Sequence, residues 1–361
     1  MKKTMKTLLS AILASTLIFA GCSSGAGTTQ SEAPSEPASS VQESAPESAT
    51  SEASEAPEGT ADGETYEIGV VQIVDHLSLN TIRDAFVKEM ETQLGDRVNI
   101  ECKDAQNDQS NLNSIVQKFV GDEKDLIVAI ATPSAQAAAA ATSEIPVLYS
   151  AVTDPEAAKL TGIPNVTGTS DAIPVESIFT LASKLTPDAK KFGLVYNTSE
   201  VNSVSVIEQA KEYMSANGYE FAEATITNTS ELQQAASSLV GKVDAMFTPI
   251  DNTVASALAV IAGVCNENKI PYYVGADSMV SDGGLATVGI DYSVLGTRTA
   301  QMAAEVLGGK SPSDIPFEVM SDFSTILNTK TAETIGVQVP EDVLSSATLF
   351  DGTQGELTAG E

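Results

Sequence analysis

Short buried-type segments alternate with amphipathic segments along the chain from residue 67 onward. Polar turn residues follow each of the segments 67–74, 98–105 and 125–131, and an amphipathic or alanine-rich stretch follows each turn. An apolar run bounded by turn residues is typical of a parallel strand covered on both faces, and the stretches between such runs are typical of the covering helices. The pattern therefore predicts an α/β fold with doubly wound parallel sheets.

Two long stretches repeat the same order of elements. Residues 125–149 and 244–274 each contain a buried strand, a polar turn, a helix of small residues, the dipeptide Ile-Pro and a second buried strand. Equivalent strands begin at 125 and 244 in one pair and at 67 and 192 in another, and such near-constant spacing indicates a duplicated topology. Because ligands of parallel sheets bind beyond the carboxyl ends of the strands, we expect two lobes that face each other across a cleft.

The chain is expected to pass between the lobes about three times, and these crossings would form a hinge. The strand–helix alternation starts afresh near residue 173, a helix over 292–308 is expected to pack back on the first lobe, and 317–327 returns to the second. The folded part is also longer than one hydrophobic core usually supports. We assign residues 65–173 and 292–320 to lobe 1, 174–291 and 321–350 to lobe 2, and 351–361 to a flexible tail.

The N-terminus has the pattern of a secretion signal that ends at a cysteine. Three lysines among the first six residues precede an apolar run over 8–20, which is too short to span a bilayer as a helix. The sequence FAGC at 19–22 resembles the lipobox of bacterial lipoproteins, with Phe19 where Leu is usual. We predict that 1–21 is a signal peptide and that Cys22 carries a lipid; a plain signal peptide with an incidental cysteine is the alternative.

The segment after this cysteine consists mainly of Ser, Glu, Ala and Pro. Residues 23–64 include nine acidic residues and no Lys or Arg. Such a composition buries too little apolar surface to offset chain entropy. Residues 22–64 are therefore predicted to be a disordered tether that holds the folded part near the outer face of the cytoplasmic membrane.

The chain is strongly acidic, with 49 Asp and Glu against 19 Lys and Arg and a net charge of −30. Nucleic acids and anionic lipid surfaces need a cationic partner surface, so neither is expected as a partner. Besides Cys22 the chain contains Cys102 and Cys265, in a predicted strand and a predicted helix of opposite halves. Both are read as buried small side chains and not as a disulfide.

Polar residues suited to a zwitterion follow predicted strands in both halves. Helix starts offer free N–H groups to a carboxylate, and hydroxyl or amide side chains lie there at Thr132, Ser134, Asn202 and Ser203. Acidic residues suited to an ammonium group lie at strand ends, at Asp154, Glu200, Asp251 and Asp277. This combination fits an α-amino acid better than a sugar or a phosphate, although N-capping is an alternative role for each residue.

Catalytic and cofactor motifs are missing from the sequence. It has no Gly-x-Ser-x-Gly elbow, no metal-ligand spacing of His and Cys, no phosphate loop and no dinucleotide fingerprint. We therefore expect no enzyme activity, no cofactor and no metal. The single histidine, His76, follows the first predicted strand, where it contacts either ligand or solvent. Trp is absent, which disfavours sugar stacking; Tyr149, Tyr196 and Tyr292 offer an aromatic wall, with at least two of them expected in the core.

Four motifs, in order, resemble those of ABC-transporter substrate-binding lipoproteins, a family that includes tryptophan/tyrosine-type binding proteins. They are IATPSAQA at 130–137, AVTDP at 151–155, YNTSEVNS at 196–203 and TPIDNTVAS at 248–256. The resemblance covers nearly all of 66–345. It implies the type I periplasmic-binding fold, an aromatic amino acid such as tryptophan, tyrosine or phenylalanine as ligand, and delivery to a permease with its ATPase. It also implies ligand contacts at Thr132, Ser134, Asp154, Glu200, Asn202, Ser203, Asp251, Asn252 and Asp277.

Residues and resemblance together predict a monomeric, lipid-anchored, extracytoplasmic component of an amino-acid importer that works by domain closure. Two alternatives stay open. One is a nucleoside or sugar receptor on the same fold, and the other is a ligand sensor that signals to a membrane kinase.

Overall fold

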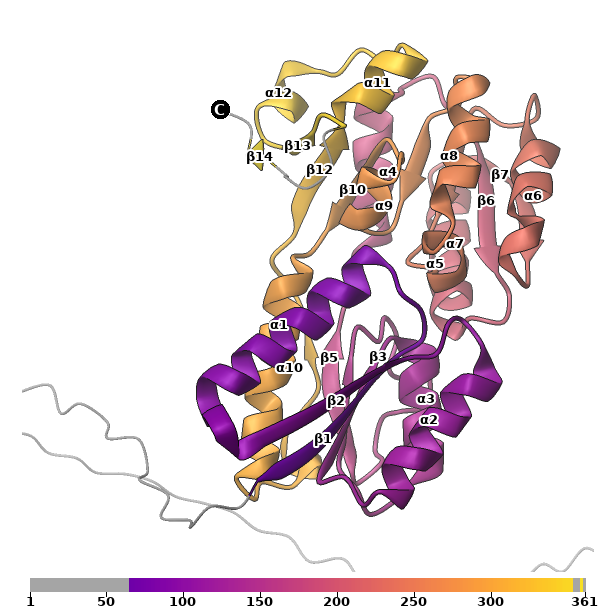
Figure 1. The fold of residues 1–361 in the computed structure, drawn as a ribbon. Coiled ribbons are helices and arrows are strands. Elements are labelled where there is room, and N and C mark those ends of the chain that lie inside the picture. The colour runs from indigo at the N-terminus through magenta and orange to yellow at the C-terminus, as the bar shows by residue number, and fades with distance from the viewer. Residues whose placement is uncertain (1–64, 353–357, 360–361) are drawn as a thin grey trace, which may run out of the picture. The chain divides into compact units, whose positions relative to one another are not determined.

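The computed structural model describes residues 65–352 and 358–359 (Figure 1). The predicted signal peptide, Cys22 and the predicted tether lie outside the described residues, as do 353–357 and 360–361 of the predicted tail. Two sheets form the framework of the described part.

The first sheet is parallel throughout. Its six strands follow the order β11 (Glu318–Val319), β5 (Val166–Ser170), β4 (Val147–Ser150), β3 (Leu126–Ile130), β1 (Tyr66–Gln72) and β2 (Val98–Asp104). All residues of β3, β4 and β5 are buried, as expected for strands covered on both faces.

The second sheet has eight described strands. Their order is β14 (Thr358–Ala359), β13 (Thr348–Phe350), β12 (Ser324–Asn328), β10 (Ala286–Gly289), β9 (Tyr272–Val274), β8 (Ala245–Thr248), β6 (Lys191–Asn197) and β7 (Glu220–Ile226). The pairs β10–β12 and β13–β14 are antiparallel. The chain leaves β11 at the carboxyl edge of the first sheet, which faces the carboxyl edge of the second sheet. It enters β12 at that facing edge, and β12 therefore runs antiparallel to β10.

Helices cover both sheets in packed pairs (Figure 1). The first sheet carries α1 (Leu77–Leu94) with α10 (Tyr292–Leu307), and α2 (Gln109–Gly121) with α3 (Thr132–Ala141). The second carries α4 (Val175–Leu185) with α5 (Val201–Ala216), and α6 (Leu232–Leu239) with α8 (Leu258–Glu267). Shorter helices are α7 (Asn252–Ala255), α9 (Asp277–Ser281), α11 (Thr329–Ile335) and α12 (Glu341–Leu344), with 3₁₀ turns η1 (Gly95–Arg97), η2 (Thr229–Glu231) and η3 (Pro312–Asp314).

The chain passes between the sheets three times, between β5 and α4, between β10 and α10, and between β11 and β12. This arrangement confirms the predicted fold of two doubly wound lobes. The expectation of two buried cysteines is half wrong. Cys265 in α8 is buried, whereas Cys102 is exposed because β2 is the edge strand of its sheet.

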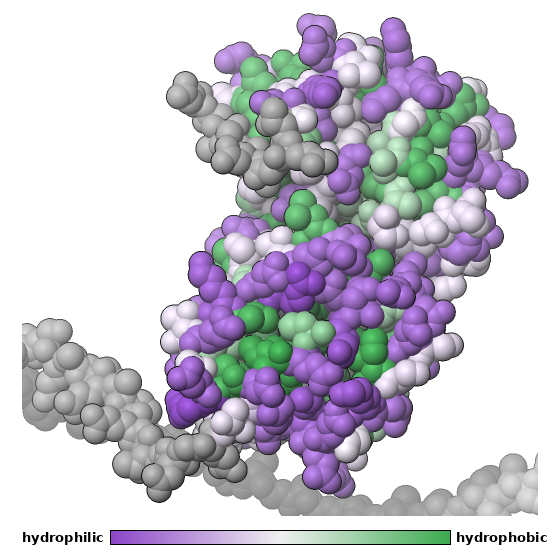
Figure 2. Space-filling view, viewed as in Figure 1, coloured by the Kyte–Doolittle hydropathy of each residue, from purple (hydrophilic) through white to green (hydrophobic). Residues whose placement is uncertain are grey.

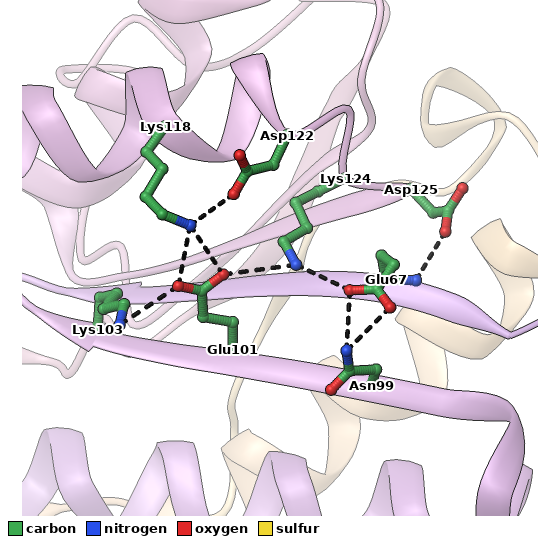
Figure 3. Close-up of polar contacts among 8 residues, drawn as sticks. All are labelled: Glu67, Asn99, Glu101, Lys103, Lys118, Asp122, Lys124 and Asp125. Atoms are coloured by element: carbon green, nitrogen blue, oxygen red, sulfur yellow. Dashed lines mark hydrogen bonds and ion pairs between the residues drawn. The ribbon is translucent and has the colours of Figure 1, made fainter.

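A network of ion pairs fixes the start of the folded region (Figure 3). The buried ammonium of Lys124 lies 2.9 Å from Glu67 on β1 and 3.5 Å from Glu101 on β2. Lys118 on α2 binds Glu101 at 3.1 Å, and the Asn99 amide donates to Glu67. Exposed pairs contribute little singly, but Lys124 joins two strands from a buried position and would be costly to leave unpaired.

Hydrophilic residues occupy most of the visible face, as expected for an acidic chain (Figure 2). None of the described helices has both the length and the apolar character needed to span a bilayer.

The contact between α1 and α10 depends on Gly296. A Cβ atom at this position would clash with the backbone oxygen of Ile82 and lie 3.0 Å from the Ala85 Cβ. The two helices, separated by two hundred residues in sequence, therefore pack backbone against backbone at this point.

We expect Gly296→Ala to lower the free energy of unfolding by about 1–3 kcal/mol, because overpacking outweighs the better helix propensity of alanine. Thermal unfolding followed by circular dichroism measures the effect. The matched control is Gly263→Ala in α8, where a Cβ meets nothing within 4 Å; it should be neutral or slightly stabilising. Equal effects at both positions would contradict the close packing.

Candidate ligand-binding site

A cavity lies between the two sheets, beyond the carboxyl ends of their strands. Its free volume is about 10 Å³, the room of roughly one water molecule. The first lobe and α10 contribute His76, Ser78, Leu79, Ala131, Thr132, Ala151, Thr153, Asp171 and Tyr292, and the second lobe contributes Asn202, Ile250, Asp251, Asn252, Ala255, Ala276, Ser278 and Met279. The two lobes therefore enclose a narrow space between the carboxyl edges of their sheets.

Asp171, directly after β5, is the buried acid on the first-lobe side of this cavity. Its carboxylate accepts hydrogen bonds from the Thr153 hydroxyl at 2.8 Å and the Tyr292 hydroxyl at 3.4 Å. Burial raises its pKa to about 6, and no described cation acts on it. Its own backbone N–H is the third donor. A carboxylate that is buried and ionised at neutral pH with only neutral donors calls for a cationic partner.

The start of α3 favours a negatively charged group, whereas Asp171 favours a positively charged one. Ala131 at the N-cap has a φ of 75° and supplies no side-chain cap, so the first N–H groups of this ten-residue helix keep no side-chain partner. Ala151, the strand-end residue of the neighbouring β4, also has a positive φ, of 58°. Backbone strain of this kind concentrates at binding and catalytic sites, and a helix start favours an anion.

Buried polar atoms without a hydrogen-bond partner gather around the cavity. Six such side-chain atoms occur among the described residues, and five of them belong to four residues at the cleft: His76 (both ring nitrogens), Thr132, Ser134 and Asn202. Buried polar groups in native proteins are almost always paired. This concentration of exceptions at one place marks the cavity as the candidate ligand site.

In the second lobe, side-chain carboxylates bind the first N–H groups of α7. Glu200 is 5% exposed, and its carboxylate accepts from the backbone N–H groups of Asn252 and Thr253 at 3.0 and 2.9 Å. Asp251 accepts from the N–H groups of Asn197 and Val254 at 2.7 and 2.9 Å. Burial and the neighbouring Glu200 charge raise the pKa of Asp251. The positive end of α7 is thus neutralised by the protein itself, whereas α3 and α1 begin at the cavity without a side-chain cap.

Three hydrogen bonds join the lobes around the cavity. The hydroxyls of Ser78 and Ser278 lie 2.6 Å apart, and the Asn107 amide donates to the Thr253 hydroxyl at 3.3 Å. The Ser205 hydroxyl donates to Asp154. These contacts hold the carboxyl edges of the two sheets together across the site.

Comparison with known proteins identifies the family. A family model described as ABC transporter substrate-binding protein matches residues 67–350. The chain belongs to this family.

Relatives of this substrate-binding protein have named ligands. A tyrosine-binding protein of Clostridioides difficile is 44% identical over 279 residues, 75% of this chain and 81% of that protein. An ABC domain from Streptococcus pneumonia, solved in complex with L-Trp, is 36% identical with a TM-score of 0.77 and covers 79% of this chain and 99% of its own. The ligand-free, open structure of a Clostridium difficile substrate-binding protein with adhesive properties is 40% identical with a TM-score of 0.62 and the same coverage.

The structure brings five of the predicted site residues to the cavity of this substrate-binding protein. They are His76, Thr132, Asn202, Asp251 and Asn252. Ser134 lies one turn into α3 with its hydroxyl buried and unpaired. The other four are not among the lining residues. Glu200 caps α7, Ser203 is buried beside Asn202, Asp154 binds the Ala157 N–H and Ser205, and Asp277 borders a neighbouring, more open cavity.

Sequence reasoning missed Asp171, Thr153 and Ser278. The signal for Asp171 was present, since it follows a predicted strand just as Asp154 does. Of the three tyrosines considered for an aromatic wall, only Tyr292 lines the cavity; Tyr149 is in the core, and the Tyr196 hydroxyl donates to Glu223. No cluster of three or more His, Cys, Asp or Glu suited to a metal occurs within residues 65–352.

The imidazole of His76 should be neutral throughout the physiological range. Burial lowers its pKa from 6.5 to about 4. Between pH 4 and pH 6.5 the unfolded chain binds more protons at this residue than the folded chain does. The contribution of His76 to the free energy of unfolding is therefore complete above pH 6.5 and is lost as the pH falls towards 4. A shift of this size corresponds to about 3 kcal/mol.

Because His76 is the only histidine, NMR titration of the untagged protein should show one imidazole resonance with a pKa near 4. The control compares acid unfolding of the native chain with His76→Gln, since Asp171, Asp251 and Asp277 titrate in both proteins. The difference in stability should shrink between pH 6.5 and 4. An imidazole pKa near 6.5 in the folded protein would contradict the buried position.

Proposed function

We propose that this protein binds an α-amino acid with an aromatic side chain between its lobes and serves as the extracytoplasmic binding component of an ABC importer. The observation that carries the proposal is the convergence, in one interlobe cavity, of unpaired buried polar atoms with a buried carboxylate that lacks a cation. A zwitterion supplies an ammonium group to the carboxylate and a carboxylate to the unpaired polar atoms.

Each end of the zwitterion has a matching protein group. The ammonium binds Asp171, whose two hydroxyl partners fix its carboxylate. The ligand carboxylate binds at the start of α3, where the unpaired hydroxyls of Thr132 and Ser134 add hydrogen bonds. Charge-assisted hydrogen bonds of this kind are stronger than neutral ones.

Seven of the seventeen lining residues are apolar, which suits an aromatic side chain. They are Leu79, Ala131, Ala151, Ile250, Ala255, Ala276 and Met279. Methionine sulfur contacts aromatic rings favourably. The names of the tyrosine-binding relative and the L-Trp complex agree with this ligand class. A sugar or nucleoside has less support, because Tyr292 is the only Phe or Tyr in the lining.

Domain closure is part of the proposal. The TM-score is higher to the L-Trp complex than to the ligand-free, open relative, although sequence identity is lower. The three interlobe hydrogen bonds also favour a closed arrangement. A ligand that contacts both lobes stabilises the closed state by its differential affinity, and a permease with its ATPase would recognise that state. We assign the protein no catalysis and no cofactor, and we expect a monomer.

Ligand binding should raise thermal stability. At about 100 times the dissociation constant a ligand adds ~2.7 kcal/mol to the free energy of unfolding, so a screen of amino acids, sugars and nucleosides should show shifts with aromatic amino acids. Asp171→Asn should weaken tyrosine binding by roughly tenfold to a hundredfold, the range for a hydrogen bond to a charged group.

The matched ligand control is 3-(4-hydroxyphenyl)propanoate, which lacks the ammonium group. Its affinity should not fall in Asp171→Asn. Stabilisation by a sugar or nucleoside, with no shift from any amino acid, would refute the ligand assignment.

We also propose that Cys22 anchors the protein by a lipid at the outer face of the cytoplasmic membrane, with the acidic segment 23–64 as a tether. The lipobox-like sequence and the lysine-led apolar run support this. In a bacterial host, Cys22→Ser should move the protein from the membrane fraction to the soluble fraction, because a lipid supplies the attachment. The control is Cys102→Ser, which should leave the distribution unchanged. Membrane retention of Cys22→Ser would contradict the anchor.

A further inference from the structure

The amide of Asn202 presents a buried acceptor whose orientation is fixed. Its Nδ2 group donates to the Ile250 carbonyl oxygen at 2.7 Å and lies 3.3 Å from the Glu200 carboxylate. Both neighbours are acceptors only, so the nitrogen must face them and the oxygen must face the other way. Asn202 is 2% exposed and lines the cavity, and its Oδ1 atom has no hydrogen-bond partner.

This oxygen differs chemically from the other unpaired atoms at the cleft. The hydroxyls of Thr132 and Ser134 can donate or accept, and a neutral imidazole has one nitrogen of each kind. The Asn202 Oδ1 atom can only accept. It therefore needs a donor from the ligand, and in the proposed binding mode the ammonium group is already held by Asp171.

We propose that Asn202 Oδ1 accepts a hydrogen bond from a ring O–H or N–H on the ligand side chain, so that the site selects tyrosine or tryptophan over phenylalanine. The inference rests on the proposed amino-acid function and adds the basis of side-chain selection. Phenylalanine has no ring donor and would leave the buried oxygen unpaired. Sites built to bind a ligand hydroxyl discriminate strongly against the analogue that lacks it.

The order of the strands separates the two ends of the ligand. Along the carboxyl edge of the first sheet, Asp171 follows β5, Thr132 follows β3 and His76 follows β1. With neighbouring strands ~4.8 Å apart, the ends of β5 and β1 are about 14 Å apart. An aromatic amino acid with a hydrogen bond of about 2.8 Å at each end is of comparable length.

In this proposal Asn202 lies at the end away from Asp171. It contacts Glu200, which also binds the Asn252 amide and whose charge acts on His76. By contrast, Asp171 is bound by Thr153 after β4 and by Tyr292 at the start of α10. The ligands named for the two relatives, tyrosine and L-Trp, both carry a ring donor, which fits an acceptor at this end.

Calorimetric titration of the purified protein with L-tyrosine, L-tryptophan and L-phenylalanine tests the inference through a ratio of dissociation constants. In the native chain phenylalanine should bind roughly tenfold to a hundredfold more weakly than tyrosine. In Asn202→Ala the two affinities should fall within about threefold of each other. Any general damage to the site affects both ligands and cancels in the ratio. Asn113→Ala, at an exposed asparagine of α2, should keep the native ratio.

Equal affinities in the native chain, or a tyrosine preference that survives in Asn202→Ala, would overturn the inference and place the ammonium or another group at this oxygen. If Asn202→Ala binds neither ligand, Asn202→Leu replaces it, because leucine is of similar size and offers no hydrogen-bond acceptor. A ratio near one then supports the inference, and the native ratio overturns it. Failure of all three amino acids to bind the native chain would instead refute the proposed function itself.

Discussion

A buried polar atom without a hydrogen-bond partner costs about 1–3 kcal/mol, and such atoms are concentrated at the interlobe cavity. Four residues at the cleft hold five such atoms, and Asp171 adds a buried carboxylate that no described cation neutralises. A protein that keeps several unsatisfied groups together gives up stability that packing elsewhere has to supply. The arrangement makes physical sense when a ligand satisfies the whole set, because binding then recovers the cost.

The fold concentrates these groups because parallel strands end at one edge. Residues after β1, β3, β4 and β5 meet residues after β8 and β9, together with Asn202 on α5, across one cavity. The two lobes contribute differently. In the second lobe, Glu200 and Asp251 neutralise the start of α7, whereas in the first lobe α3 begins without a side-chain cap. The proposed position of the ligand carboxylate at the start of α3 rests on this asymmetry and on the unpaired hydroxyls of Thr132 and Ser134.

Much of the fold followed from pattern alone. Unbroken apolar runs such as 126–130 predicted buried parallel strands, and the repeat of 125–149 at 244–274 predicted two lobes. The antiparallel entry of β12 was not predictable from periodicity, because strand direction depends on the edge at which the chain crosses. Cys102 was misjudged for a related reason, since a sequence does not state which strand lies at the edge.

Five of the ten predicted site residues line the cavity, and the role of each could not be predicted from the sequence. Strand-end polar residues were expected at the cleft, yet only the folded structure separates those that bind backbone N–H groups, such as Glu200, from those that lack a partner, such as Thr132. The most direct test of the account is a crystal structure of the protein with L-tyrosine. The account predicts the ligand between the lobes, with its ammonium on Asp171 and its carboxylate at Thr132 and Ser134. Tyrosine bound outside this cavity, or with its carboxylate against Asp171, would contradict it.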